Sequence, residues 1–206
     1  MRYRWWRLVV FVCALSVPVY WLYLAWQFAL GPDPGKVLVD RLGEGALLLL
    51  LITLSMTPLQ RLSGWGGWLA VRRQLGLWCF TYASLHLASY LYFLLGGELW
   101  RLGEELAERP YILVGAIGLI GLAILAMTSY RWSMRLLGKR WKAVHRLIYG
   151  IVIVVLLHML WVVRADSARW FVYAGIAFTL LLARAPAMAA ILPSVRDRKR
   201  PGIKPK

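Results

Sequence analysis

Three histidines, His86, His145 and His158, are the only histidines of the chain, and each lies within or at the edge of a long apolar segment. Ionisable side chains are costly inside a membrane, and they usually face the interior of a helix bundle or a cavity. Imidazole is a common axial ligand of haem iron, and facing helices of a bundle can hold a cofactor between them. The three histidines are therefore candidate haem ligands, with packed, hydrogen-bonded residues as the alternative.

The depth of each histidine indicates which of them could share one iron. His86 follows Arg73 by 13 residues, and His158 follows Arg146 by 12 residues and Lys142 by 16. At 1.5 Å per residue, His86 lies about 20 Å deep and His158 about 18–24 Å deep. The distribution of Lys and Arg predicts that both segments run outward from the cytoplasmic face. The two imidazoles therefore match in height and could hold one haem nearer the periplasmic face.

His145 lies at the inner edge of the segment that contains His158, about 20 Å away along the helix axis. That separation would suit a second haem, but 13 residues do not return to one face of an ideal helix, so a distortion near Gly150 would be needed. At the matching height of the other segment stand Arg72 and Arg73, which are not usual iron ligands. A second iron would need a methionine, a water or a backbone group, and His145 could instead pair with lipid phosphate.

The composition predicts an integral membrane protein. Hydrophobic residues make up 61% of the 206 residues and charged residues 17%, against about 45–50% and about 25% in soluble domains. A spanning helix needs about 20 mostly apolar residues, so six spans account for nearly the whole length as a single domain, residues 1–206. We expect an all-α bundle with spans near 8–30, 43–60, 74–95, 111–129, 144–163 and 170–192, followed by a basic tail, 193–206.

The net charge of +16 is better explained by topology than by nucleic acid binding. Most of the 25 Lys and Arg residues lie in four segments, 1–7, 61–73, 131–146 and 184–206, whereas the other loops hold most of the nine acids. Cytoplasmic loops carry an excess of Lys and Arg. Both termini are therefore predicted to be cytoplasmic, and the number of spans is even.

Other sequence signals narrow the function. The first apolar run, 8–30, is longer than a signal-peptide core of about 7–15 residues, so we expect a retained helix. Cys13 and Cys79 stand alone in apolar stretches and are expected to be buried, unpaired residues. No internal repeat is evident, and the chain has no GxGxxG, P-loop, HExxH or G-x-S-x-G motif. The cytoplasmic loops are too short to hold a flavin or nicotinamide domain.

A series of short motifs along the chain carries a family resemblance. The series consists of TPL (57–59), RRQLGL (72–77) leading to Tyr82 and His86, RPYILVG (109–115), TS (128–129), LGKRWKAVHRLIY (137–149) and His158. In this order and spacing the chain resembles the haem-binding membrane subunits of the bacterial periplasmic methionine-sulfoxide reductase system, the MsrQ or YedZ family. That family is part of the ferric-reductase-like transmembrane group, which includes the membrane part of NADPH oxidases.

The resemblance implies a protein of the bacterial inner membrane that holds b-type haem between its third and fifth helices. It implies His86, His158 and His145 as ligands, although the oxidases carry a second histidine where this chain has arginine. It also implies FMN, for which no residue can be named. Electrons would come from the quinone pool or a cytosolic flavin reductase. They would pass to a periplasmic molybdopterin subunit that reduces methionine sulfoxide, so the sulfoxide chemistry belongs to that partner in a heterodimer.

Three other functions stay open. A transporter or channel would need buried charged residues along its path, and the predicted spans contain few away from their ends. A structural or assembly protein would use the histidines for packing alone. A transmembrane ferric or oxygen reductase would keep the haem and change the acceptor. The basic loop 131–146 could dock an acidic flavoprotein or membrane lipid, and the acidic loop 96–110 could guide the periplasmic partner.

Overall fold

The computed structural model describes residues 3–163 and 167–184, and all regular secondary structure in these residues is helical. The long helices are α1 (Arg4–Trp26), α2 (Pro34–Ser63), α3 (Gly67–Ser89), α5 (Pro110–Met127), α8 (Leu147–Val162) and α9 (Ser167–Leu182). The short ones are a π-helix, η1 (Tyr90–Leu94), then α4 (Leu99–Glu108), α6 (Arg131–Leu137), a 3₁₀ turn, η2 (Gly138–Arg140), and α7 (Trp141–His145). The predicted all-α class is confirmed.

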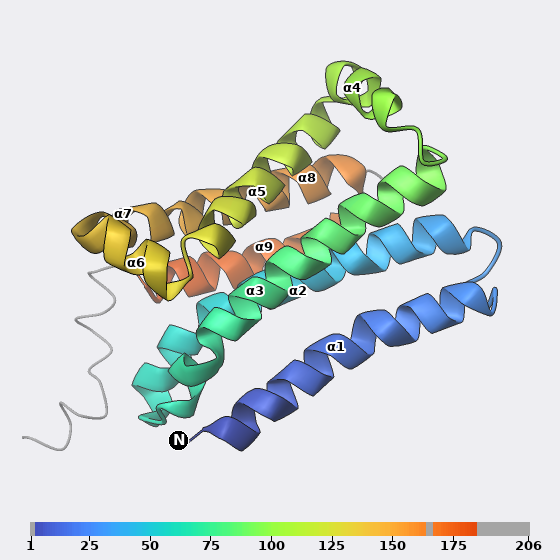
Figure 1. The fold of residues 1–206 in the computed structure, drawn as a ribbon. Helices are drawn as coiled ribbons and strands as arrows, with labels where there is room; N and C mark the ends of the chain where they lie inside the picture. The colour runs from blue at the N-terminus through green and yellow to red at the C-terminus, as the bar shows by residue number, and fades with distance from the viewer. Residues whose placement is uncertain (1–2, 164–166, 185–206) are drawn as a thin grey trace, which may run out of the picture.

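The long helices form one bundle built on two tightly packed pairs. The α2 and α3 helices make the most extensive helix contact, and α5 with α8 makes the next. The α1 helix packs on α2 and α3, whereas α9 packs on α8 and α2 (Figure 1). The start of α1, the turn between α2 and α3, and the α6–α7 segment lie at one end, which we call the inner end. The α4 helix and the turn between α1 and α2 lie at the opposite, outer end (Figure 1).

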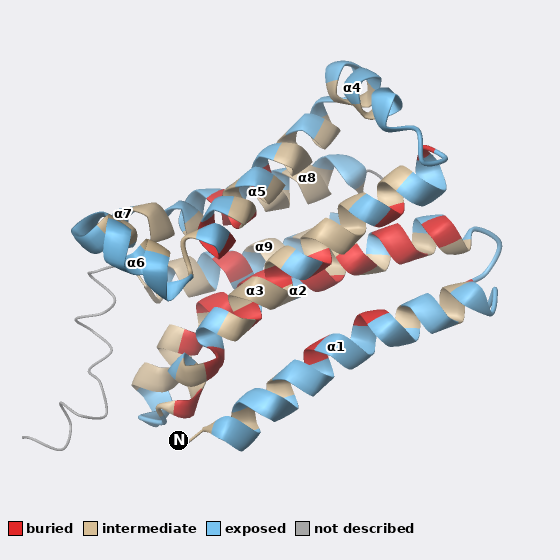
Figure 2. Cartoon of the chain, viewed as in Figure 1, coloured by how far each residue is buried: buried red, intermediate tan, exposed pale blue. Residues whose placement is uncertain are grey.

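Length and apolar composition qualify two described helices, α1 and α5, as membrane spans. The segment Arg131–His145 and the helix Leu147–Val162 pass the same test together as a pair bent by 45°, and α9 is a shorter apolar helix. Burial agrees with a lipid environment. Figure 2 shows the buried residues concentrated on α2 and α3, whereas α1 buries only Ala14 and Pro18 and exposes a row of large apolar side chains.

Two prolines leave backbone carbonyls free to bond between helices. A helical carbonyl normally accepts the N–H four residues later, and proline has none. Pro18 thereby frees the Ala14 carbonyl, which accepts the Tyr82 hydroxyl at 2.8 Å and joins α1 to α3. Pro58, the proline of the TPL motif, frees the Leu54 carbonyl.

The freed Leu54 carbonyl ties the chain after α9 to α2. Arg184 donates to it from Nε at 3.0 Å and from Nη2 at 2.7 Å. Pro58 therefore has a structural role at the inner end, because it leaves an acceptor that one guanidinium engages twice.

The segment 96–110 contains a helix where the sequence suggested only a loop. The α4 helix is tied to its neighbours through Glu105, which accepts the Tyr90 hydroxyl at 2.8 Å and pairs with Arg109 Nε at 3.1 Å. Pro110 then occupies the first position of α5, where its missing N–H has no helical partner to lose. The α4 helix thus connects the outer ends of α3 and α5.

The basic segment 131–146 is also largely helical, and it bends away from the helix that follows. The α7 helix ends at His145 and α8 begins at Leu147, so the break lies at Arg146 and not near Gly150. Trp141 Nε1 donates to the Thr128 carbonyl at 3.0 Å and holds α7 against the end of α5.

The ends of some predicted spans differ from the observed helices. The α1 helix ends at Trp26, before the predicted boundary at residue 30. The predicted end of the last span at residue 192 and the basic tail 193–206 lie outside the described residues. Both cysteines are free. Cys79 is buried as expected, with its Sγ 3.3 Å from the Ala46 carbonyl. Cys13 on α1 was expected to be buried but is exposed.

Candidate functional site

His86 on α3 and His158 on α8 lie next to each other inside the bundle. Their ring centroids are 6.3 Å apart, and the ring planes are nearly perpendicular at 83°. Both rings are partly buried. We call these two residues the histidine pair. The α3–α5 contact brings the two helix pairs together, so residues 72 positions apart in the sequence meet at one place.

Each imidazole of the histidine pair is held by a backbone carbonyl of the partner helix. His86 Nδ1 lies 2.8 Å from the Val39 oxygen on α2, and His158 Nδ1 lies 2.7 Å from the Tyr111 oxygen on α5. A carbonyl oxygen only accepts, so Nδ1 carries the proton in both rings. In a neutral imidazole with this tautomer, Nε2 keeps a lone pair and can bind a metal.

The spacing of the histidine pair suits two ligands on opposite sides of one metal ion. A metal–imidazole bond is about 2 Å long, so the two ligating nitrogens would be about 4 Å apart and the ring centroids about 6 Å apart. The observed 6.3 Å agrees with that value. The ring spacing is therefore compatible with two imidazole ligands of one metal ion.

The two histidines alone do not complete a metal centre. The described residues contain no group of three or more His, Cys, Asp or Glu side chains that could hold a metal ion. Further ligands would have to come from a prosthetic group with its own donor atoms. A porphyrin supplies four nitrogens in a plane and leaves two axial positions, which matches a site with two imidazoles.

His145 does not join the histidine pair. It lies on α7 beyond the break at Arg146, and its ring stacks on Trp141 with centroids 4.1 Å apart and planes 30° apart. Its Nδ1 is buried, and the Trp141 carbonyl one turn back lies nearby without the geometry of a hydrogen bond. A metal bound by His145 would need a second ligand, and the chain has no further histidine to supply it.

Arginines occupy the inner end near His145. Arg72 Nη1 lies 3.4 Å from the Thr57 hydroxyl. The guanidinium of Arg73 lies over the Tyr130 ring, 5.8 Å from its centroid. Both arginines therefore have neighbours of their own.

Sequence reasoning missed a polar contact close to the histidine pair. Tyr173 on α9 donates its hydroxyl to Glu44 Oε1 on α2 at 2.5 Å. Glu44 follows Gly43, where an added Cβ would lie 2.9 Å from His86 Nδ1. An acidic residue inside an apolar segment was the available signal, because such a residue needs a partner within the bundle.

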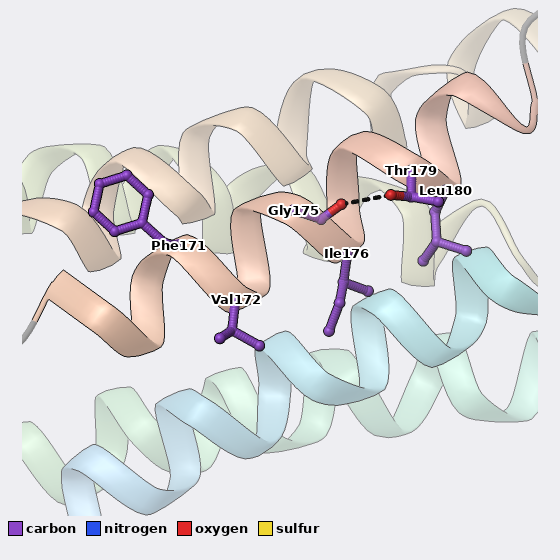
Figure 3. A pocket seen from close by; sticks show the side chains of 6 residues that line it. All are labelled: Phe171, Val172, Gly175, Ile176, Thr179 and Leu180. Carbon is purple, nitrogen blue, oxygen red and sulfur yellow. Dashed lines mark hydrogen bonds between the residues drawn. The ribbon is translucent and has the colours of Figure 1, made fainter.

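A surface hollow along α9 is apolar and separate from the histidines. It has a volume of about 420 Å³ and opens outward (Figure 3). Its lining consists of Phe171, Val172, Gly175, Ile176, Thr179 and Leu180. None of these side chains is titratable, so the hollow offers no acid, base or ligand for chemistry.

Comparison with known proteins identifies the class. The family model described as "Ferric reductase like transmembrane component" matches residues 42–156, a stretch from α2 to α8 that includes His86 and His145 and ends two residues before His158. The chain belongs to this family of membrane proteins.

A curated relative is more specific. The protein-methionine-sulfoxide reductase heme-binding subunit MsrQ of Yersinia pseudotuberculosis serotype O:1b (strain IP 31758) is 40% identical to this chain over 186 residues. The alignment covers 89% of this chain and 92% of that protein. The resemblance deduced from the motifs is therefore confirmed, and the chain is a homologue of MsrQ. No solved structure matches the chain.

Proposed function

We propose that this chain is a b-type haem subunit that transfers electrons across the bacterial inner membrane to a periplasmic methionine-sulfoxide reductase. The observation that supports it most is the histidine pair: two imidazoles 6.3 Å apart, each oriented by a carbonyl so that Nε2 is available. The name of the Yersinia relative supports the haem and the reductase system. Six spans with both termini in the cytoplasm complete the proposal.

His86 and His158 would hold the haem nearer the periplasmic face. The residues fit this group because their rings are suitably spaced and their tautomers are fixed by the carbonyls of Val39 and Tyr111. When bound, a haem iron with two imidazole ligands takes up and releases one electron at a time. The carbonyls hold the rings in place, and both rings are partly buried.

The electron donor and acceptor would be separate molecules. The described residues form one helical bundle without a nucleotide-binding domain, so electrons would come from quinol or a cytosolic flavin reductase. The acceptor would be a molybdopterin subunit, which performs the sulfoxide chemistry on oxidised proteins. The outer end, where α4 lies, would face that partner (Figure 1).

The proposal includes a second haem near His145. His145 would be one ligand, and the opposite ligand would have to be a group other than histidine. The stacking of His145 on Trp141 favours a single rotamer of the ring. FMN, which the family resemblance implies, remains a prediction without assigned residues.

A transmembrane ferric or oxygen reductase is the second candidate, and the description of the matching family favours it. The two functions differ in the acceptor. Purified protein in liposomes, reduced from the inside with a quinol, would be offered methionine sulfoxide with the cognate periplasmic reductase, or a ferric chelate alone. The proposal expects rapid reoxidation of the haem band only with the reductase and its substrate.

The matched control is His86→Ala, which removes one proposed ligand and leaves the loops that would contact the partners unchanged. It should insert normally and fail to transfer electrons. Transfer to ferric chelate alone would replace the proposal with the second candidate. Purified wild-type protein without a Soret band would remove both.

A further inference from the structure

The two carbonyls that hold the histidine pair share a second feature, a glycine four residues later. Gly43 follows Val39 on α2, and Gly115 follows Tyr111 on α5. In an α-helix the residue at i+4 directs its N–H toward the carbonyl of residue i. A side chain on residue i+4 would therefore lie next to the carbonyl of residue i, where a donor from another helix has to approach.

Any side chain at these glycines would meet an imidazole. A Cβ on Gly43 would lie 2.9 Å from His86 Nδ1 and 3.1 Å from its Cε1. A Cβ on Gly115 would lie 2.8 Å from His158 Cε1 and 2.9 Å from its Nδ1. The clash would fall on the ring edge that carries the hydrogen bond, so the ring would have to move away from its carbonyl.

The arrangement occurs twice with the same spacing. Each histidine follows the residue of its carbonyl by 47 positions. The two carbonyl residues, the two glycines and the two histidines are each 72 positions apart. The helix pairs that contain them, α2 with α3 and α5 with α8, are also the two most extensive helix contacts. The sequence shows no evident repeat, so this equivalence of the two pairs appears only in the structure.

Ordinary helix packing does not explain the two glycines. Gly121, also on α5, faces Ile151 of α8, and a Cβ there would lie 2.8 Å from Ile151 Cγ1. Gly118 faces Val155 in the same interface. These glycines let helices approach through apolar side chains. Gly43 and Gly115 instead face ring nitrogens that are bonded to the backbone of the glycine's own helix.

We propose that Gly43 and Gly115 are positioning residues for the proposed haem ligands, an inference that rests on the proposed function. By leaving the Val39 and Tyr111 carbonyls open, they allow the Nδ1–H bonds that fix the tautomer and direct Nε2 toward the iron. Such a bond also makes the imidazole a stronger donor. Weakening it should lower the haem affinity by about 10–100-fold and raise the midpoint potential, because the ferric form loses stabilisation.

The test compares Gly43→Ala and Gly115→Ala with Gly121→Ala, which crowds the same bundle without touching a histidine. Haem affinity, midpoint potential and the low-spin electron paramagnetic resonance spectrum are measured on purified protein. The first two variants should bind haem more weakly, with a raised potential and altered g-values, and Gly121→Ala should resemble wild type. Wild-type spectra and potentials in both histidine-facing variants, or equal changes in all three, would overturn the proposal.

A haem-independent measurement separates this inference from the proposed function. Nitrogen-15 spectra of labelled histidine in haem-free wild-type protein should show His86 and His158 protonated at Nδ1. The alanine variants should lose that fixed tautomer, whereas Gly121→Ala should keep it. Absence of the Nδ1–H tautomer in the wild type contradicts the positioning role. This test needs only the wild-type protein, so it also applies if a glycine variant fails to insert. A fixed tautomer in a protein that binds no haem contradicts only the proposed function.

Discussion

The contact between Tyr82 and the carbonyl freed by Pro18 gives a quantitative prediction. Tyr82 is 3% exposed, and its hydroxyl bonds the Ala14 carbonyl at 2.8 Å. In Tyr82→Phe that buried acceptor has no replacement, because Pro18 offers no N–H. Leaving a buried acceptor unsatisfied costs about 1–3 kcal/mol, more than the average of about 0.6 kcal/mol for a side-chain hydrogen bond in a membrane protein.

The second half of a double-mutant cycle tests the cause. In Pro18→Ala, residue 18 regains an N–H that can bond the Ala14 carbonyl within α1. Adding Tyr82→Phe to that background should then cost about 0.6 kcal/mol or less. The ring keeps its contact with Trp21 in both backgrounds. The coupling energy, the difference between the two costs, should be about 1 kcal/mol.

The assay is reversible unfolding in mixed micelles with increasing dodecyl sulfate, followed by tryptophan fluorescence. Free energies of unfolding are compared for the wild type, the two single variants and the double variant. An equal loss in the free energy of unfolding for Tyr82→Phe in both backgrounds would refute the reasoning, because the contribution of the hydroxyl would then not depend on the missing N–H at Pro18.

Two further predictions concern the α2–α9 contact and the topology. Tyr173→Phe removes the hydroxyl that donates to Glu44, so it should lower the free energy of unfolding by about 1.5–3 kcal/mol. The control is Tyr23→Phe, at an exposed position of α1. Equal stability of the two variants would contradict a stabilising role of the Tyr173–Glu44 hydrogen bond. In a cysteine-free background, Glu104→Cys should react with an impermeant maleimide from the periplasm and Lys139→Cys only after the cytoplasmic side is opened. Both positions are exposed, and the reverse labelling would invert the proposed orientation.

Much of the fold could be predicted because the bilayer imposes simple rules on sequence. Long apolar runs indicated the segments in which the six long helices lie, although α2 begins at Pro34, before the predicted start at residue 43, and the predicted end of the last span lies outside the described residues. The break at Arg146 could not be predicted, because it depends on how α7 packs: Trp141 reaches the Thr128 carbonyl at the end of α5. Contacts between distant segments leave no periodic pattern in the sequence.

The candidate site could be predicted only in part. Depth alone paired His86 with His158, since helices that cross the same bilayer share a scale of 1.5 Å per residue. Depth does not specify which way a ring points, so the Val39 and Tyr111 carbonyls were not foreseeable. The acceptor is a backbone atom present in every residue, and the only local signal is a glycine four positions later. Glu44 was visible in the sequence, but Tyr173 on a distant helix was not an evident partner.

The ratio of haem to protein in the purified wild type, His86→Ala, His158→Ala and His145→Ala tests the central claim most directly. If the histidine pair holds one haem, His86→Ala and His158→Ala should each lose the same one equivalent and its low-spin spectrum while still inserting as folded protein. His145→Ala should keep that haem. Unchanged haem content and spectrum in both His86→Ala and His158→Ala would contradict the account and leave the two rings as packing residues of a membrane bundle.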